Sequence, residues 1–151
     1  MLHETVFRSA DVSAEDRFEY WSELFQRTHA PLELFSDRHD DFRAYQRVLN
    51  LGAVTVWPAT LPAVRFRRTE RMVRQSDPER FHLSLRLSGT MRVERGGIQS
   101  EFGPYDLCVI DTSRPFDCES GVRLPPDSAQ AGVGLEIPSR NCRPASTEST
   151  S

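Results

Sequence analysis

The strict alternation in residues 81–87 is the feature that most constrains the fold of this chain. The segment reads FHLSLRL, so that four apolar residues alternate with three polar ones. A period of two places the two sets on opposite faces of an extended strand. We expect the apolar set to face the core, with Leu83, Leu85 and Leu87 on the inner face.

Glycine-containing turns follow this strand at short intervals. They lie at 88–90, at Gly96-Gly97 and at Gly103-Pro104, and each is followed by a segment that reads as a short strand. Such spacing is typical of an antiparallel barrel or sandwich. Further strands are predicted over 51–57, ending at Pro58, and over 133–137, and the periodicity predicts no helix between residues 26 and 118.

One amino-terminal helix is expected over Ala14–Gln26. Ser13 is a good N-cap residue, and Phe18, Trp21 and Phe25 recur at helical spacing. We interpret this aromatic stripe as a packing face rather than a cofactor site. The predicted fold class is therefore mainly β (α+β), with one helix on a small barrel or sandwich.

Length and composition indicate a single domain. The chain has 151 residues with 38% hydrophobic side chains, which suffices for one core. We place that domain at 1–138 and expect 139–151, rich in Ser, Thr and Pro, to be a disordered tail. No apolar run is long enough for a membrane span, and the first residues lack a signal-peptide pattern.

Charge and cysteine usage narrow the class of protein further. The net charge is −3, which argues against a generic nucleic-acid binder, and three cysteines without a CxxC pair argue against a disulfide scaffold. The cysteine usage favours a cytoplasmic protein. Residues 42–100 carry 11 Arg and 4 acids, whereas both flanks are acidic, so the middle meets either an acidic partner or its own flanks.

Catalytic and metal sites are poorly supported by the motifs. His82, Asp111 and Ser113 have the residue types of a hydrolase triad, but no Gly-x-Ser-x-Gly elbow surrounds the serine. The four histidines are scattered without the paired spacing of a metal-binding cupin, and Cys108 reads as a buried inert thiol. We expect no enzyme activity, no cofactor and no metal.

The arginine-rich run 65–74 has two interpretations. Arginines interleaved with Phe66 could form a nucleic-acid groove. The simpler interpretation is a strand pair with arginines outward and apolar residues inward. No pair of amphipathic helices follows that could form a helix-turn-helix, so we expect no sequence-specific DNA binding by this chain alone.

Six short motifs in order resemble the amino-terminal, cupin-like domain of AraC/XylS-family transcription regulators, most strongly over residues 7–118. They are Phe18-x-x-Trp21, Leu51-Gly52-x-Val54-x-Val56, Arg68-Thr69-x-Arg71, Leu83-x-Leu85-x-Leu87-Ser88-Gly89, Gly103-Pro104-x-Asp106-Leu107 and Asp111-Thr112-Ser113-Arg114-Pro115-Phe116.

This resemblance implies an effector-sensing and dimerisation domain. In such regulators a DNA-binding domain follows, and we interpret this chain as a form truncated before that domain. The implied partners are a small organic effector and a second subunit, as a homodimer or a heterodimer with a full-length regulator. A stand-alone cupin-like enzyme, which a metal analysis would reveal, and a non-functional remnant or dimerisation-only inhibitor are the alternatives.

Six residues are singled out within this framework. Trp57, His82 and Arg86 are the candidate ligand-binding residues, because Trp57 ends a predicted strand and the other two share a face. Asp106, Asp111 and Arg114 are candidate turn residues. Aspartates in these turns can accept backbone amide hydrogen bonds, and a residue before proline is held extended.

Overall fold

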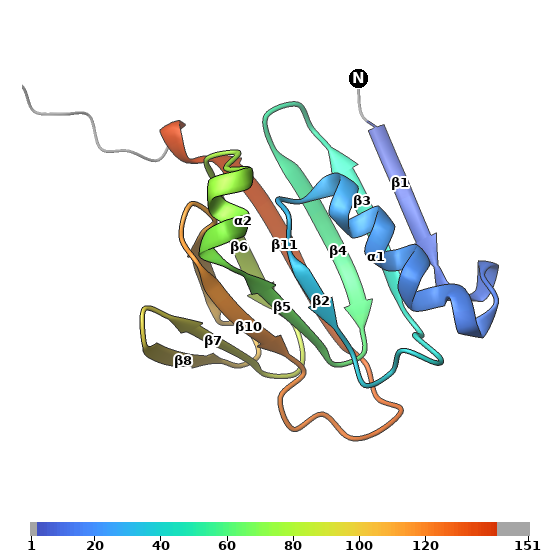
Figure 1. Ribbon diagram of the computed structural model, residues 1–151. Helices are drawn as coiled ribbons and strands as arrows, with labels where there is room; N and C mark the ends of the chain where they lie inside the picture. The colour runs from blue at the N-terminus through green and yellow to red at the C-terminus, as the bar shows by residue number, and fades with distance from the viewer. Residues whose placement is uncertain (1–2, 142–151) are drawn as a thin grey trace, which may run out of the picture.

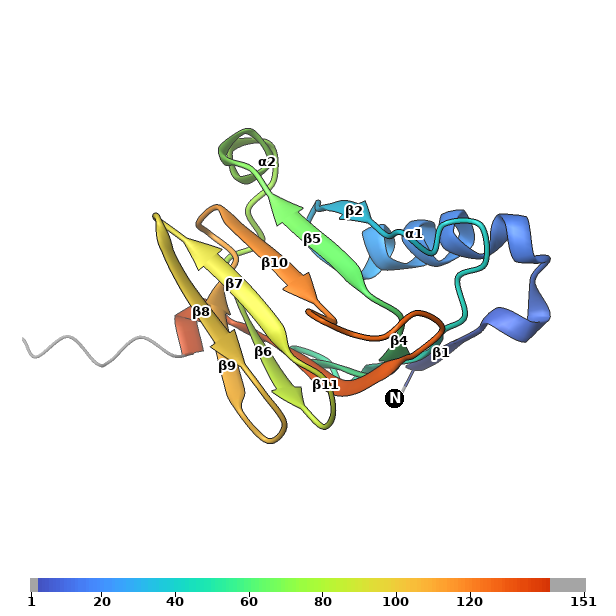
Figure 2. The same cartoon turned by 90° about the horizontal axis from the view of Figure 1, so that it is seen from below.

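The alternating and glycine-punctuated segments fold into two antiparallel sheets packed face to face, as Figure 2 shows in side view. The computed structural model describes residues 3–141. The first sheet has the order β1 (His3–Arg8), β3 (Tyr45–Asn50), β4 (Thr55–Leu61), β11 (Gln130–Pro138), β6 (Arg80–Arg86) and β9 (Leu107–Asp111). The second has the order β2 (Glu33–Phe35), β5 (Val64–Arg68), β10 (Phe116–Ser120), β7 (Met91–Arg95) and β8 (Ile98–Phe102). The mainly β prediction is confirmed.

The predicted amino-terminal helix is present with shifted bounds. A short 3₁₀ turn, η2 (Ala14–Asp16), leads into α1 (Arg17–Thr28), and the Ser13 side chain makes no capping hydrogen bond. In Figures 1 and 2 the helix continues the layer of β2 and lies over the end of the first sheet that holds β1 and β3. A further 3₁₀ turn, η1 (Ser9–Asp11), joins β1 to this region.

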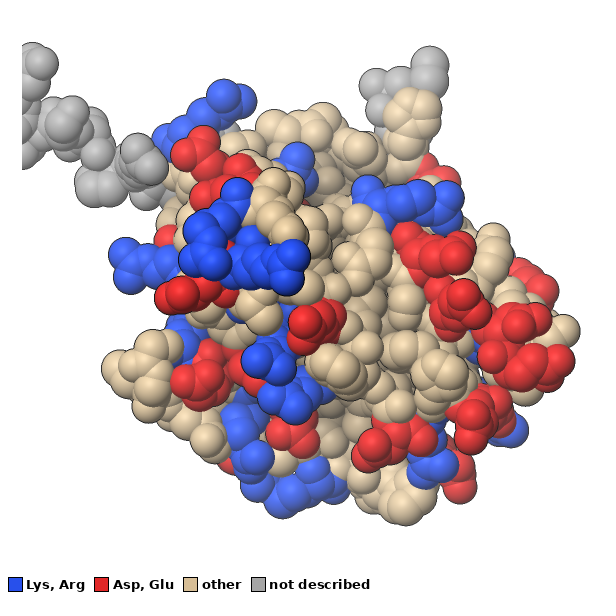
Figure 3. All heavy atoms as spheres, in the orientation of Figure 1, with Lys and Arg blue, Asp and Glu red and all other residues tan. Residues whose placement is uncertain are grey.

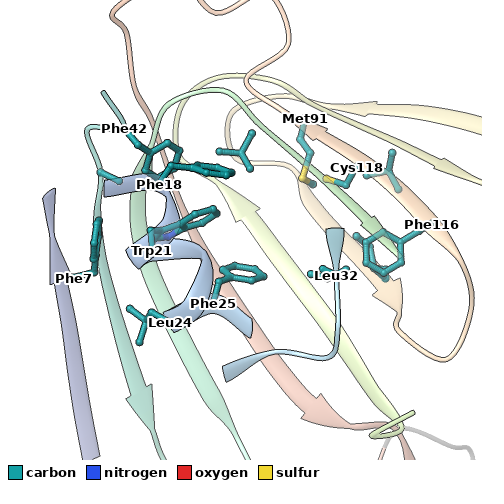
Figure 4. Close-up of a cluster of buried hydrophobic side chains, with 14 of the residues drawn as sticks. Phe7, Phe18, Trp21, Leu24, Phe25, Leu32, Phe42, Met91, Phe116 and Cys118 are labelled. Carbon is teal, nitrogen blue, oxygen red and sulfur yellow. The ribbon is translucent and has the colours of Figure 1, made fainter. Parts of the chain in front are cut away.

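The aromatic stripe of the helix forms much of the core, as predicted. Phe18, Trp21 and Phe25 are buried, and Figure 4 shows their side chains pointing toward the strands together with Phe42. The Trp21 indole N–H donates to Gln46 Oε1 at 2.8 Å, so its polar atom is satisfied inside the core. The cluster continues through Leu32 to Met91, Phe116 and Cys118 at its other end.

A second helix contradicts the prediction of no helix between residues 26 and 118. The arginine-rich run does not form a strand pair: β5 ends at Arg68, and α2 (Glu70–Gln75) follows. Thr69 caps this helix, because its side chain accepts a hydrogen bond from the Met72 amide. The Thr69 cap and the acidic residue in the first turn stabilise this short helix, although the sequence pattern of the segment is strand-like.

The direction of the β6 alternation also differs from the prediction. Ser84 and Arg86 are buried, whereas Leu87 is 43% exposed and Leu83 and Leu85 are half-buried. The leucines therefore lie on the outer face of the first sheet, beside exposed side chains of β9. The polar set points between the sheets because a cavity occupies that space.

Three predicted boundaries change. β4 begins at Thr55, four residues after the predicted start, and runs through Pro58 to Leu61. Its register with β3 skips Trp57 and Pro58, since proline has no N–H to donate to the ladder. β11 begins at Gln130, three residues before the predicted strand. Ser139–Asn141 forms the 3₁₀ turn η3, with Ser139 N–H donating to Glu79 O at 2.8 Å. The rest of the predicted tail, with Cys142, lies outside the described residues.

Several arginines of the basic middle, residues 42–100, form ion pairs with acidic residues of the two flanking segments. Arg47 pairs with Glu4, Arg65 with Asp117, Arg67 with Glu33, Arg80 with Glu136, and Arg92 with Glu101 and Glu119. Figure 3 shows basic side chains gathered near α2 and β5, with acidic side chains among them and more acidic ones near α1. These ion pairs favour the interpretation that the acidic flanks, and not an acidic partner, neutralise much of the basic middle.

Candidate functional site

A cavity of about 110 Å³ lies between the two sheets. Its walls come from β4, β6 and β11 of the first sheet, from β5, β7 and β10 of the second, and from the end of α1. The three candidate ligand-binding residues, Trp57, His82 and Arg86, all line it. Trp57 is in the middle of β4, not at its end, and its role in binding stays a prediction.

Stacked rings form one wall of the cavity. The His29 ring lies between Phe25, with centroids 3.5 Å apart, and Trp57, with centroids 3.9 Å apart. The His82 ring lies beyond Trp57, at 5.5 Å between centroids. Burial lowers the pKa of His82 to about 4, and burial followed by repulsion from His82 lowers the pKa of His29. Both rings are therefore neutral at pH 7.

Arg86 lies at one end of the cavity. Its Nη2 donates to Gln130 Oε1 at 2.7 Å and to Ser88 O at 3.3 Å, and Gln130 Nε2 donates in turn to Ser120 Oγ at 2.7 Å. This chain links β6, β11 and β10. Burial lowers the pKa of the guanidinium, but an arginine side chain keeps its charge at neutral pH because its ordinary pKa is very high.

Two glycines of β11 make room for these side chains. A Cβ on Gly132 would lie 2.9 Å from Arg86 Nη1, and a Cβ on Gly134 would lie 3.0 Å from Trp57 Cε3 and 3.1 Å from His82 Cε1. The guanidinium and the two rings thus lie directly over the backbone of the strand. Glycine at these positions allows the side chains to approach the backbone closely.

Arg68 and Glu136 form the opposite end. The Arg68 guanidinium donates to the carbonyls of Thr112 at 2.7 Å, Pro31 at 3.0 Å and Ser76 at 2.5 Å, and so joins three connecting segments. Burial raises the pKa of Glu136, whose Oε2 lies 3.3 Å from Arg80 Nη1. Both charges are therefore satisfied by the protein itself.

The three candidate turn residues lie in or beside the turns that flank β9, and none is among the residues lining this cavity. Asp106 accepts a hydrogen bond from the Gly103 amide at 2.8 Å, and Asp111 accepts one from the Ser113 amide at 2.9 Å. Arg114 is exposed, with its Nε 3.8 Å from Asp111 Oδ2. These contacts shape the loops at the ends of β9.

Sequence reasoning missed several cavity residues. His29 lay beyond the predicted helix, and Gln130 lay before the strand predicted over 133–137. One signal was available: Gly132 and Gly134 are spaced by two within a strand, which indicates a close approach by other side chains. Arg68 was assigned to the outward set of the basic run, but it is 1% exposed.

Three general features apply to residues 3–141. In this range no three His, Cys, Asp or Glu side chains are grouped so that they could hold a metal ion. Neither helix in the same range has the length and apolar character needed to cross a membrane. The thiols of Cys108 and Cys118 are both free and buried.

Two facing antiparallel sheets around a buried cavity define a cupin-like domain. The model of the AraC-binding-like domain matches residues 21–144, and the chain belongs to that family. A search of the curated proteins finds no match to the sequence.

Among solved structures, the chain is similar to the AraC-like transcriptional activator CuxR, with a TM-score of 0.75 and 18% identity over 91% of this chain and 48% of that one. The chain thus spans about half the length of that activator. It is also similar to the cupin domain of Cnp3 from Schizosaccharomyces pombe, with a TM-score of 0.47 and 6% identity over 70% and 68% of the two chains. The EutQ protein of Clostridium difficile gives 0.45 and 10% over 64% of each.

Proposed function

We propose that this domain senses a small organic effector for an AraC-type transcription regulator in the cytoplasm, by binding and not by catalysis. The observation that carries the proposal is the cavity between the sheets, with mostly apolar walls and a few polar groups, the usual form of a small-molecule site. Membership of the AraC-binding-like family supports a role in transcription regulation. Free cysteines are compatible with a reducing compartment.

Binding is favoured over catalysis because most polar groups of the cavity are already engaged. His29 Nδ1 lies 3.1 Å from Phe25 O and 2.8 Å from Thr28 Oγ1, and Arg68 donates to three carbonyls. Side chains held by such hydrogen bonds position a ligand or stabilise the fold. A nucleophile paired with a base, as acyl or group transfer requires, is not part of this arrangement.

A thermal-shift screen of small organic compounds tests the proposal. A compound at 100 times its Kd stabilises the folded state by about 2.7 kcal/mol, a shift of several degrees in Tm. Gly134→Ala narrows the cavity, because the added methyl lies against Trp57 and His82. Gly103→Ala is the control, since its methyl meets only Asp106 Oδ2 at 3.8 Å.

Compounds that bind in the cavity will stabilise the wild type and the Gly103→Ala variant, and will stabilise Gly134→Ala less. A compound that raises the Tm of all three equally binds elsewhere. A broad screen without any stabilising compound would contradict the proposed function.

A second function, self-association, is favoured by the outer face of the first sheet. Leu107 and Val109 of β9 are 55% and 46% exposed, and they lie opposite Leu85 and Leu83 of β6. Val133 and Leu135 of β11 extend this apolar surface, which we call the outer leucine face. We propose a second copy of the domain, in a homodimer or in a heterodimer with a full-length regulator, as its partner.

A further inference from the structure

Two hydrogen-bond donors in the cavity have no acceptor. The Trp57 Nε1 and the Arg86 Nε are both buried, and neither has a partner in the described chain. Their residues are 3% and 7% exposed, and both line the cavity. Native proteins rarely leave buried donors unpaired, and two in one cavity indicate a ligand that brings acceptor atoms.

The charged residues that line the cavity indicate the charge of that ligand. Among the ionisable residues lining the cavity, Glu136 has Arg80 as its counter-ion, and Arg68 is held by three carbonyls. Arg86 has only the neutral Gln130 and Ser88 as partners, and within residues 3–141 no carboxylate oxygen lies within 4.0 Å of its nitrogens. A buried charge is normally paired with an opposite charge, so we expect the ligand to place one negative charge near Arg86.

The side chains of the cavity walls and the cavity volume indicate the polarity and size of the rest of the ligand, which we call its body. The stack of Phe25, His29 and Trp57 presents uncharged aromatic rings, and Phe66 and Ile110 are further lining residues. A cavity of about 110 Å³ is comparable to the ~150 Å³ cavity known to bind benzene. The body of the ligand is therefore apolar and about as large as one ring.

We propose that the cavity binds a single-ring monocarboxylate, whose acceptor oxygens take the free donors of Arg86 and Trp57. The inference rests on the proposed function, because it names the class of effector for the same cavity. Arginine suits this role, since its guanidinium donates charge-assisted hydrogen bonds to carboxylates. A monoanion is favoured over a phosphate dianion because one charge is uncompensated.

Benzoate and benzamide form the matched pair of probes, because they share ring and size and differ in charge. Isothermal titration at pH 7.5 should show benzoate binding the wild-type protein at least about tenfold more tightly than benzamide. Arg86→Met should remove that preference by weakening benzoate alone. Arg114→Met is the matched control, since it removes an exposed arginine outside the cavity and should leave the preference intact.

Two further measurements remain decisive if Arg86→Met fails to fold. Gly132→Ala displaces the guanidinium, because its methyl would lie 2.9 Å from Arg86 Nη1, and it should reduce the benzoate preference. The chain has two tryptophans, so the amide spectrum contains two indole N–H signals. Benzoate should shift the Trp57 signal more than that of Trp21, whose N–H already donates to Gln46.

The outcomes separate this inference from the proposed function. Equal affinity for benzoate and benzamide, or binding only of neutral compounds from the screen, would overturn the carboxylate assignment and leave a small-molecule sensor. Failure of every screened compound would overturn both. A benzoate preference that Arg86→Met and Gly132→Ala both preserve would place the anion elsewhere and also overturn the inference.

Discussion

The His29 imidazole stacks on the Trp57 indole, with ring centroids 3.9 Å apart and planes inclined by 19°. His29 is the residue after the end of α1, and Trp57 is in the middle of β4. Their contact therefore joins the helix directly to the wall of the cavity. We therefore expect that a ligand that displaces the Trp57 ring would also displace His29 and the end of α1.

The neutral histidines predict a loss of stability in mild acid. Unfolded histidine has a pKa near 6.5, whereas the pKa of His82 is about 4 and that of His29 is also lowered. Between pH 6.5 and 4 the unfolded state binds more protons, so the free energy of unfolding falls as the pH falls. His82 alone contributes about 3 kcal/mol to this fall.

Urea denaturation across this pH range measures the effect. The raised pKa of Glu136 acts in the opposite direction, and the lowered pKa values of Asp41, Glu101 and Asp117 add to the loss in the more acidic part of the range. His82→Phe should flatten the profile, whereas His39→Gln, at an exposed position, should not. A profile unchanged by His82→Phe would contradict the prediction.

Arg68→Met should destabilise the domain strongly. The guanidinium is 1% exposed and donates to three carbonyls, in the segments containing Pro31, Ser76 and Thr112. Its loss leaves these acceptors unpaired, for which we expect about 2–4 kcal/mol in the free energy of unfolding. Arg67→Met is the matched control and should change it by less than about 0.5 kcal/mol, since Arg67 is exposed. Equal effects would refute this role of Arg68.

Leu107→Glu with Val109→Glu should abolish self-association while preserving the fold. Both side chains are exposed on the outer leucine face, so the charges remain hydrated in the monomer and would be buried in a dimer. Light scattering after size exclusion should show a dimer for the wild type and a monomer for the double variant. Leu51→Glu, which changes another exposed leucine, should remain dimeric. A monomeric wild type would contradict the proposed self-association.

The described chain should show no sequence-specific DNA binding. Within residues 3–141 the α-helices are α1 and the six-residue α2, and α1 has Glu19 and Glu23 on its polar side. The arginines of α2 and β5 give at most salt-sensitive contact, with a Kd of roughly 10⁻⁴–10⁻⁶ M. A gel-shift selection from a genomic fragment pool at physiological salt tests this. Enrichment of one sequence that resists competitor DNA would show that the strands read bases.

Local patterns in the sequence were sufficient for the elements whose signal is periodic. The spacing of Phe18, Trp21 and Phe25 predicted the helix and its buried side, and the glycine turns predicted the antiparallel strands. Trp57, His82 and Arg86 were selected as candidates for one site, and the fold brings them to one cavity. The α2 helix was missed because six residues provide too few turns for a periodic signal, and only its Thr69 cap marked it.

The tertiary structure alone decided which side of β6 faces inward. The alternation of residues 81–87 determined that leucines lie on one face and His82, Ser84 and Arg86 on the other, since successive side chains of a strand point in opposite directions. Which face is inner depends on what the second sheet and β11 place opposite it. Gly132 and Gly134 leave space there that polar side chains occupy, and that space is made by strands distant in sequence.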